Sequence, residues 1–85
     1  MGEISFKKGK TDLAIEYLKI ATEIKEDWPD PYLKLGYAYL NKGDFKLAVE
    51  SFKTFLKLAP DDPQAPTINN LIPQIENLIK KEAIP

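Results

Sequence analysis

Few residues of this chain have side chains that could carry out chemistry. The 85 residues include no cysteine and no histidine, so a thiolate nucleophile is absent, as are the commonest general base and metal ligand. Two pairs of adjacent carboxylates remain, Glu26-Asp27 and Asp61-Asp62. Both pairs precede a predicted helix, where acidic side chains stabilise the amino end. We therefore interpret them as capping groups, and we expect no catalytic residue and no bound metal.

A second candidate for chemistry is the run Gly9-Lys10-Thr11, which is similar to the end of a phosphate-binding loop. Such a loop needs an earlier glycine and a preceding strand, and this sequence offers neither. The run also lies 34 residues before another turn, which contains Gly43. We interpret it as a turn between helices, and we expect no nucleotide or other cofactor.

The charge balance limits the classes of partner. Twelve basic and thirteen acidic residues give a formal net charge of −1, which provides no strong field for nucleic acid or an acidic membrane surface. The apolar runs are too short to span a bilayer, and no secretion signal is visible. We expect no nucleic-acid or membrane partner. The compartment stays open, with a cytoplasmic location favoured, and we expect the chain to be a fragment of a longer protein.

The chain repeats itself with a period of 34 residues, and this repeat determines the expected architecture. A fixed period of this length is typical of arrays built from one supersecondary unit. Such arrays form extended surfaces along which other molecules lie. The matched pairs are Gly9 and Gly43, Leu13 and Leu47, Ala14 and Ala48, Glu16 and Glu50, Lys19 and Lys53, Asp27 and Asp61, and Pro29 and Pro63.

Apolar residues at helical spacing predict a first helix that Thr11 or Asp12 caps and that ends at about Glu26. Residues 1–8 match the back half of the second helix when shifted by 34 positions. We therefore expect them to form the last two turns of a truncated helix, and we expect Gly9 to lie in the turn that follows.

Proline, glycine and aspartate delimit the next two helices. Asp30 is the predicted cap of a second helix over residues 31–42, which has a proline in its first turn. Gly43 closes that helix in the left-handed conformation. Asp44 then caps a third helix over residues 45–58. The short joints predict that these helices are antiparallel neighbours.

The last part of the chain carries one apolar helical stripe between residues 68 and 79, interrupted by Pro73. An interior proline costs about 3 kcal/mol or more. Two outcomes are open: a kinked helix from about Gln64 to Glu82, or a shorter helix that Asn70 caps. The continuous stripe favours one helix with a bend.

One stretch combines an apolar helical face with small residues that let two helices approach closely. Its residues are Tyr32, Leu35, Gly36 and Tyr39 on one face, followed by Ala48, Phe52 and Pro60. This pattern resembles the tetratricopeptide repeat, whose 34-residue unit has the signature W-x2-L-G-x2-Y, then an alanine, a phenylalanine and a closing proline.

The sequence departs from that family's pattern in a few places. Tyr32 stands where tryptophan is most frequent, and Phe55 replaces a small residue. Glu26 stands where the preceding copy should have proline, and Asn69-Asn70 replace the leucine and glycine of the following copy. The resemblance implies an all-α fold of antiparallel helix-turn-helix repeats with a C-terminal capping helix. We expect one domain: a truncated repeat over 1–28, a complete repeat over 29–62 and a terminal helix over 63–85.

In the family that this chain resembles, the first helix of each complete repeat has a second face, and this face lines a concave groove that binds peptides. Here Leu33, Tyr37 and Leu40 form a second apolar stripe on the second helix, which implies a non-catalytic protein-interaction module with a largely apolar groove. Two alternatives stay open: the stripe is covered by the terminal helix or by a second copy in a homo-oligomer, or it has no role. The predicted groove residues are Phe6, Lys7, Asp30, Leu33, Lys34, Tyr37, Leu40, Asn41, Thr67 and Leu71.

Overall fold

The protein is an antiparallel stack of helices. The computed structural model describes the backbone of residues 2–83 and the side chains of residues 10–81, and these residues form no strand. The all-α expectation is therefore confirmed. The helices, in chain order, are α1 (Gly2–Ile24), α2 (Pro29–Lys42), α3 (Phe45–Leu58) and α4 (Ala65–Ala83).

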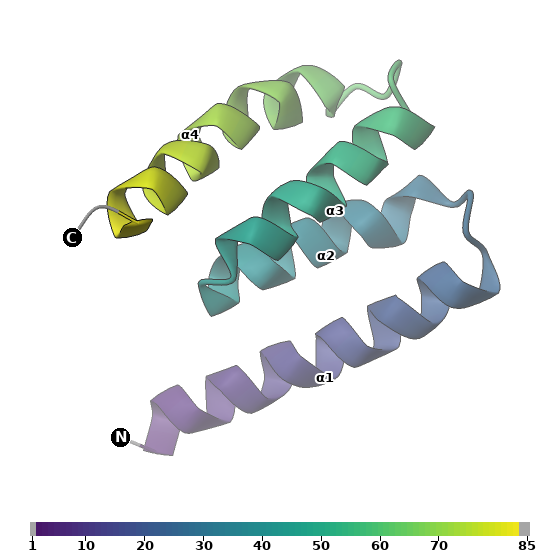
Figure 1. Ribbon diagram of the computed structural model, residues 1–85. Coiled ribbons are helices and arrows are strands. Elements are labelled where there is room, and N and C mark those ends of the chain that lie inside the picture. The colour runs from purple at the N-terminus through teal and green to yellow at the C-terminus, as the bar shows by residue number, and fades with distance from the viewer. Residues whose placement is uncertain (1, 84–85) are drawn as a thin grey trace.

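Each helix packs on the helix that follows it in the chain, so that α2 lies between α1 and α3, and α3 lies between α2 and α4 (Figure 1). Short joints reverse the chain direction at each step, as expected for neighbouring antiparallel helices. The outermost helices, α1 and α4, therefore each have one packing neighbour within the part of the chain that the structure describes.

The predicted turn at Gly9 is wrong. α1 runs without a break from Gly2 to Ile24, so neither Thr11 nor Asp12 caps a helix. Residues 1–8 were expected to form a separate stub of two turns. A stub of that length buries little surface, whereas continuation of the helix retains its backbone hydrogen bonds. The continuous helix is therefore the more stable arrangement.

The predicted turn at Gly43 is confirmed. Gly43 has φ 89°, in the left-handed region that favours glycine. Its N–H donates to the Leu40 carbonyl oxygen at 3.1 Å, and the Asp44 N–H donates to the Tyr39 carbonyl oxygen at 2.8 Å. These two bonds satisfy carbonyl groups that the helix end leaves free, in the Schellman arrangement. The turn brings α3 back along α2.

The start of α2 differs from the prediction. The helix begins at Pro29 with Trp28 as its N-cap residue, and no side chain caps it. Asp30 lies inside the first turn, where it pairs with Lys34 one turn later. Asp44 does precede α3, as predicted, but its carboxylate makes no capping hydrogen bond. The bounds of α3 agree with the prediction.

α4 is one helix that continues through Pro73, so the continuity favoured from the apolar stripe is confirmed. Pro73 itself is exposed, while Ile68 before it and Ile75 after it are fully buried. Their burial offsets the cost of the interior proline. The α4 entrance is ordered by Asp62, whose Oδ1 accepts a hydrogen bond from the Gln64 N–H at 2.9 Å.

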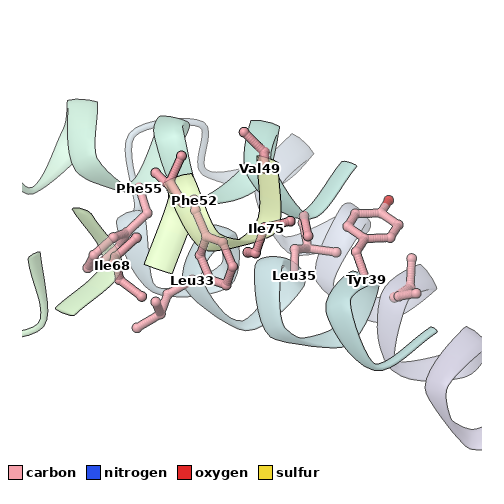
Figure 2. Close-up of a cluster of buried hydrophobic side chains, with 11 residues drawn as sticks. Leu33, Leu35, Tyr39, Val49, Phe52, Phe55, Ile68 and Ile75 are labelled. Carbon is pink, nitrogen blue, oxygen red and sulfur yellow. The ribbon is translucent and has the colours of Figure 1, made fainter. Parts of the chain in front are cut away.

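The core lies around α3, which is covered by α2 on one side and by α4 on the other (Figure 2). Phe52 and Phe55 of α3 are its largest fully buried side chains. Gly36 of α2 lies directly against the Phe52 ring, so that a Cβ added to Gly36 would be only 2.8 Å from Phe52 Cζ. This close approach is why the repeat has glycine there, although glycine inside a helix costs about 1 kcal/mol.

Candidate functional site

The open face of α2 carries four exposed side chains: Asp30, Lys34, Tyr37 and Asn41. They follow one another at helical spacing, so they form a single line along the helix. Lys34 Nζ lies 3.3 Å from Asp30 Oδ2. Both partners of this ion pair are well exposed, which makes its contribution to stability small. The pair instead places one positive and one negative charge on the same line of the helix as Tyr37.

Tyr37 is the aromatic residue of this line, and its side chain is 41% exposed. Its ring meets the Phe52 ring edge-on, with centroids 5.1 Å apart and planes at 79°. An edge-to-face contact of this kind is favourable, so it stabilises this orientation of the tyrosine ring. The result is a positioned aromatic surface that is open to solvent on its other side.

The two leucines of the predicted apolar stripe are less accessible than expected. Leu33 is only 6% exposed and belongs to the core cluster around Phe55 and Ile68. Leu40 is half-buried and packs against that cluster. The open face of α2 is therefore not a broad apolar stripe. It is a line of polar side chains with one aromatic ring. Leu33 and Leu40 lie beneath this line, in the core cluster or packed against it.

α4 contributes the other side of the candidate site. Thr67 is exposed and Leu71 is half-buried. Both lie on the side of α4 away from Glu76, which pairs with Lys53 of α3 at 3.6 Å. Leu78 continues the same side and is exposed, a residue that the sequence interpretation missed although it stands at helical spacing from Leu71. This side of α4 and the open face of α2 flank α3.

Two predicted groove residues, Phe6 and Lys7, have side chains outside the described residues. Their backbone belongs to α1 and not to a separate helix. Their proposed contribution to a groove stays a prediction from the 34-residue shift.

The electrostatics of the described residues include one clear perturbation. A hydrogen bond with the Asp12 carboxylate raises the pKa of the exposed Lys42 above its usual value of 10.5. The two groups lie 2.9 Å apart and link α1 to the end of α2. No group of three or more histidine, cysteine, aspartate or glutamate side chains able to hold a metal ion occurs in the part searched. No helix in that part is both long enough and apolar enough to cross a membrane.

Known protein families provide a further comparison. A family model described as "TPR repeat" matches residues 2–43, and a model described as "Tetratricopeptide repeat" matches residues 29–62. The two matches together run from the start of α1 to residue 62, within the α3–α4 joint, and they overlap on α2.

Curated proteins also resemble this chain. Human DnaJ homolog subfamily C member 3 is 31% identical over 85 residues, which cover 92% of this chain and 17% of the relative. The mitochondrial import receptor subunit TOM70 of Saccharomyces cerevisiae (strain ATCC 204508 / S288c) is 42% identical over 60 residues, covering 71% of this chain and 10% of the relative. The chain thus spans less than a fifth of the length of either relative.

Proposed function

Because the chain belongs to the tetratricopeptide repeat family, we propose that it binds a partner polypeptide between α2 and α4, with Tyr37 as the anchoring side chain. The chain is a protein–protein interaction module, as its family matches and relatives support. Tetratricopeptide repeats are a non-catalytic interaction fold. The proposal adds the location and the chemistry of the binding site.

The observation that carries the proposal is the partly exposed, oriented ring of Tyr37. Aromatic side chains that are already fixed lose little entropy on binding, and they are enriched among the residues that dominate interfaces. Tyr37 lies between the Asp30–Lys34 ion pair and the Asn41 amide. A suitable ligand therefore places an apolar side chain on the ring and polar backbone groups near Asn41 and the ion pair.

Residues of α4 extend this surface. Leu71 and the exposed Leu78 offer apolar contact, and Thr67 offers a hydroxyl. A peptide that lies across α3 from Tyr37 to Leu71 contacts both helices. The yeast relative is by name an import receptor subunit. We carry over to this chain only the recognition of another molecule. The proposal does not extend to protein import.

The second candidate is a homo-oligomer in which another copy of the chain covers the same surface. The terminal helix of the chain is a weaker candidate for this role, because α4 packs on α3 and leaves Tyr37 exposed. Light scattering over a range of concentrations separates a self-associating chain from a monomer that binds a different partner.

A cytoplasmic location stays a prediction from the sequence.

The test is selection of a phage-displayed library of random twelve-residue peptides on the immobilised 85-residue chain. We expect enrichment of peptides with apolar side chains, and we expect Tyr37→Glu to weaken their binding at least tenfold. Tyr17→Glu is the matched control, because it changes an exposed tyrosine on α1. Equal binding by the wild-type chain and Tyr37→Glu would show that this surface is not the peptide site.

A further inference from the structure

A pocket outside the proposed peptide site lies between α3 and α4. It is lined by Lys46 of α3 and by Glu76, Ile79 and Lys80 of α4, and its volume is about 390 Å³. The start of α3 and the end of α4 meet there, at one end of the stack (Figure 1). The volume lies in the lower part of the range of roughly 300–1,000 Å³ that small-molecule sites have. We name this site the lysine pocket.

The charges around the lysine pocket favour an anion. Lys46 and Lys80 are exposed, and neither makes an ion pair with another described side chain. Glu76 is the acidic residue of the lining, and its Oε2 lies 3.6 Å from Lys53 Nζ. The Lys53 ammonium group therefore offsets the Glu76 carboxylate. The two lining lysines then leave the pocket with a net positive charge.

Ile79 gives the lysine pocket an apolar wall. Its side chain is half-buried and packs against the core cluster, which holds it in place. The lysines come from two different helices, so the packing of α3 on α4 brings them to one pocket. A matching ligand therefore carries a negative charge for the lysines and a short aliphatic part for Ile79.

The 34-residue repeat does not account for a lysine at this place. A shift of 34 positions puts Asp12 of α1 on Lys46 of α3, so the repeat position accepts either sign of charge. Asp12 pairs with Lys42 at the end of α2, whereas Lys46 lines the lysine pocket of α3 and α4. The positive charge of the pocket is therefore a property of this pair of helices and not of every repeat.

From these contacts we infer that the lysine pocket binds a small organic anion, in which a carboxylate or a phosphate group is attached to a short aliphatic chain. The anionic group lies between the ammonium groups of Lys46 and Lys80, and the aliphatic chain packs on Ile79. An ammonium group is a compact point charge that accepts either oxyanion. Both lysines are exposed, so each contributes modestly to binding, and added salt weakens the binding.

The test is an NMR titration of the ¹⁵N-labelled 85-residue chain at low salt with hexanoate and, separately, with butyl phosphate. We expect backbone amide shifts over residues 45–49 and 76–81 with at least one of the two, and the tighter ligand identifies the anionic group. Hexanamide and butanol are the matched probes without charge. Acetate and inorganic phosphate are the matched probes without the aliphatic chain. Each matched probe should bind more weakly than its parent anion.

Variants of exposed residues locate the site. Lys46→Met and Lys80→Met should each weaken binding about three- to fivefold, as expected for exposed charges. Lys57→Met is the matched control, because Lys57 is also an exposed lysine of α3 but does not line the pocket. Methionine keeps the helix propensity of lysine, so the circular dichroism spectrum should stay that of the wild type. Glu76→Gln should tighten binding, because it removes the negative charge of the lining and frees Lys53.

Three outcomes would overturn the inference. The first is the absence of shifts over residues 45–49 and 76–81 at tens of millimolar of either anion. The second is equal binding of each anion and its uncharged probe. The third is an equal loss in Lys46→Met and Lys57→Met, because the anion is then attracted by surface charge in general. Tyr37→Glu should leave anion binding unchanged, so this result does not depend on the proposed peptide site.

Discussion

α1 and α3 carry the same positions of the 34-residue repeat, yet they differ in what surrounds them. α3 lies between two helices, and its residues Ala48, Phe52 and Phe55 are buried. α1 has one neighbour within the described residues, and Ala14 and Tyr17 are exposed. The sequence pattern of a repeat position thus specifies an interface. Burial occurs only where the partner helix is present.

The comparison also explains why the same residue type behaves differently in the two regions. Gly43 closes α2 in the left-handed conformation because α3 can then fold back onto α2. Gly9 stands at the same repeat position but lies inside α1. A turn forms when the segments on both sides of it pack against each other, as α2 and α3 do around Gly43, whereas the backbone of Gly2–Ile24 continues as one helix through Gly9.

The largest expected effect comes from truncating the matched pair Phe52 and Leu18. Phe52→Ala removes a fully buried ring and should cost about 3–5 kcal/mol in the free energy of unfolding. Leu18→Ala changes a half-buried side chain and should cost about 1–2 kcal/mol. Urea unfolding followed by circular dichroism measures both. Equal losses of unfolding free energy in the two variants would contradict the difference in burial between Phe52 and Leu18.

Exchange of residue types between Tyr17 and Ser51 should give the next largest effect. Ser51→Tyr forces a ring into a buried position, and overpacking of this kind costs about 1–3 kcal/mol. Tyr17→Ser removes an exposed ring and should change stability by less than about 0.5 kcal/mol. The same unfolding measurement applies. A substantial loss in Tyr17→Ser would mean that the ring is covered in solution, by a second copy or by another segment.

The two glycines should respond to alanine with opposite signs. Gly43→Ala puts a Cβ on a residue with φ 89°, which costs about 1–2 kcal/mol. Gly9→Ala replaces a glycine inside a helix and should stabilise the chain by about 0.5–1 kcal/mol. Thermal midpoints of the two variants are compared with that of the wild type. A destabilised Gly9→Ala variant would indicate that a turn forms at Gly9 after all.

The smallest effect concerns the Lys42–Asp12 ion pair, which joins α1 to the end of α2. The pKa of Lys42 is raised in the folded state, chiefly by its hydrogen bond with Asp12. Any stability from this shift is therefore present below pH 10.5 and is lost as the pH rises through the raised pKa of Lys42. Asp12→Asn should lower the pKa of Lys42 toward its usual value, as measured by an NMR titration of the lysine side chain. An unchanged pKa would mean that the pair does not form in solution.

Much of the fold followed from the sequence because local signals agreed with packing. The bounds of α3, the turn at Gly43 and the continuity of α4 through Pro73 were all predicted. The continuous α1 was not predicted. The shift of 34 positions treats Gly9 and Gly43 as equivalent and takes no account of the helices that pack beside each of them. The start of α2 was placed two residues late because Asp30 was assigned as a cap, whereas Trp28 takes that position.

The candidate site was predicted less completely than the fold. The periodicity placed Leu33 with Tyr37 on one apolar stripe, but Leu33 is buried with the core cluster. A stripe near the boundary between two helices cannot be divided into core and surface from one sequence alone. The high exposure of Tyr17 and Ile24 on α1 was not predicted either. Apolar residues at helical spacing usually form a core, and the spacing alone does not show which of them a neighbouring helix covers.

The most direct test of the account is a variant in which residues 29–44 are placed directly before Thr11, in place of residues 1–10. This gives α1 its own covering helix and keeps the 34-residue register. We expect the free energy of unfolding to rise by on the order of 2–5 kcal/mol, and we expect Tyr17→Ser to become destabilising in the extended chain. Unchanged stability, with Tyr17→Ser neutral in both chains, would contradict the claim that the sequence pattern of this repeat position specifies an interface with a covering helix.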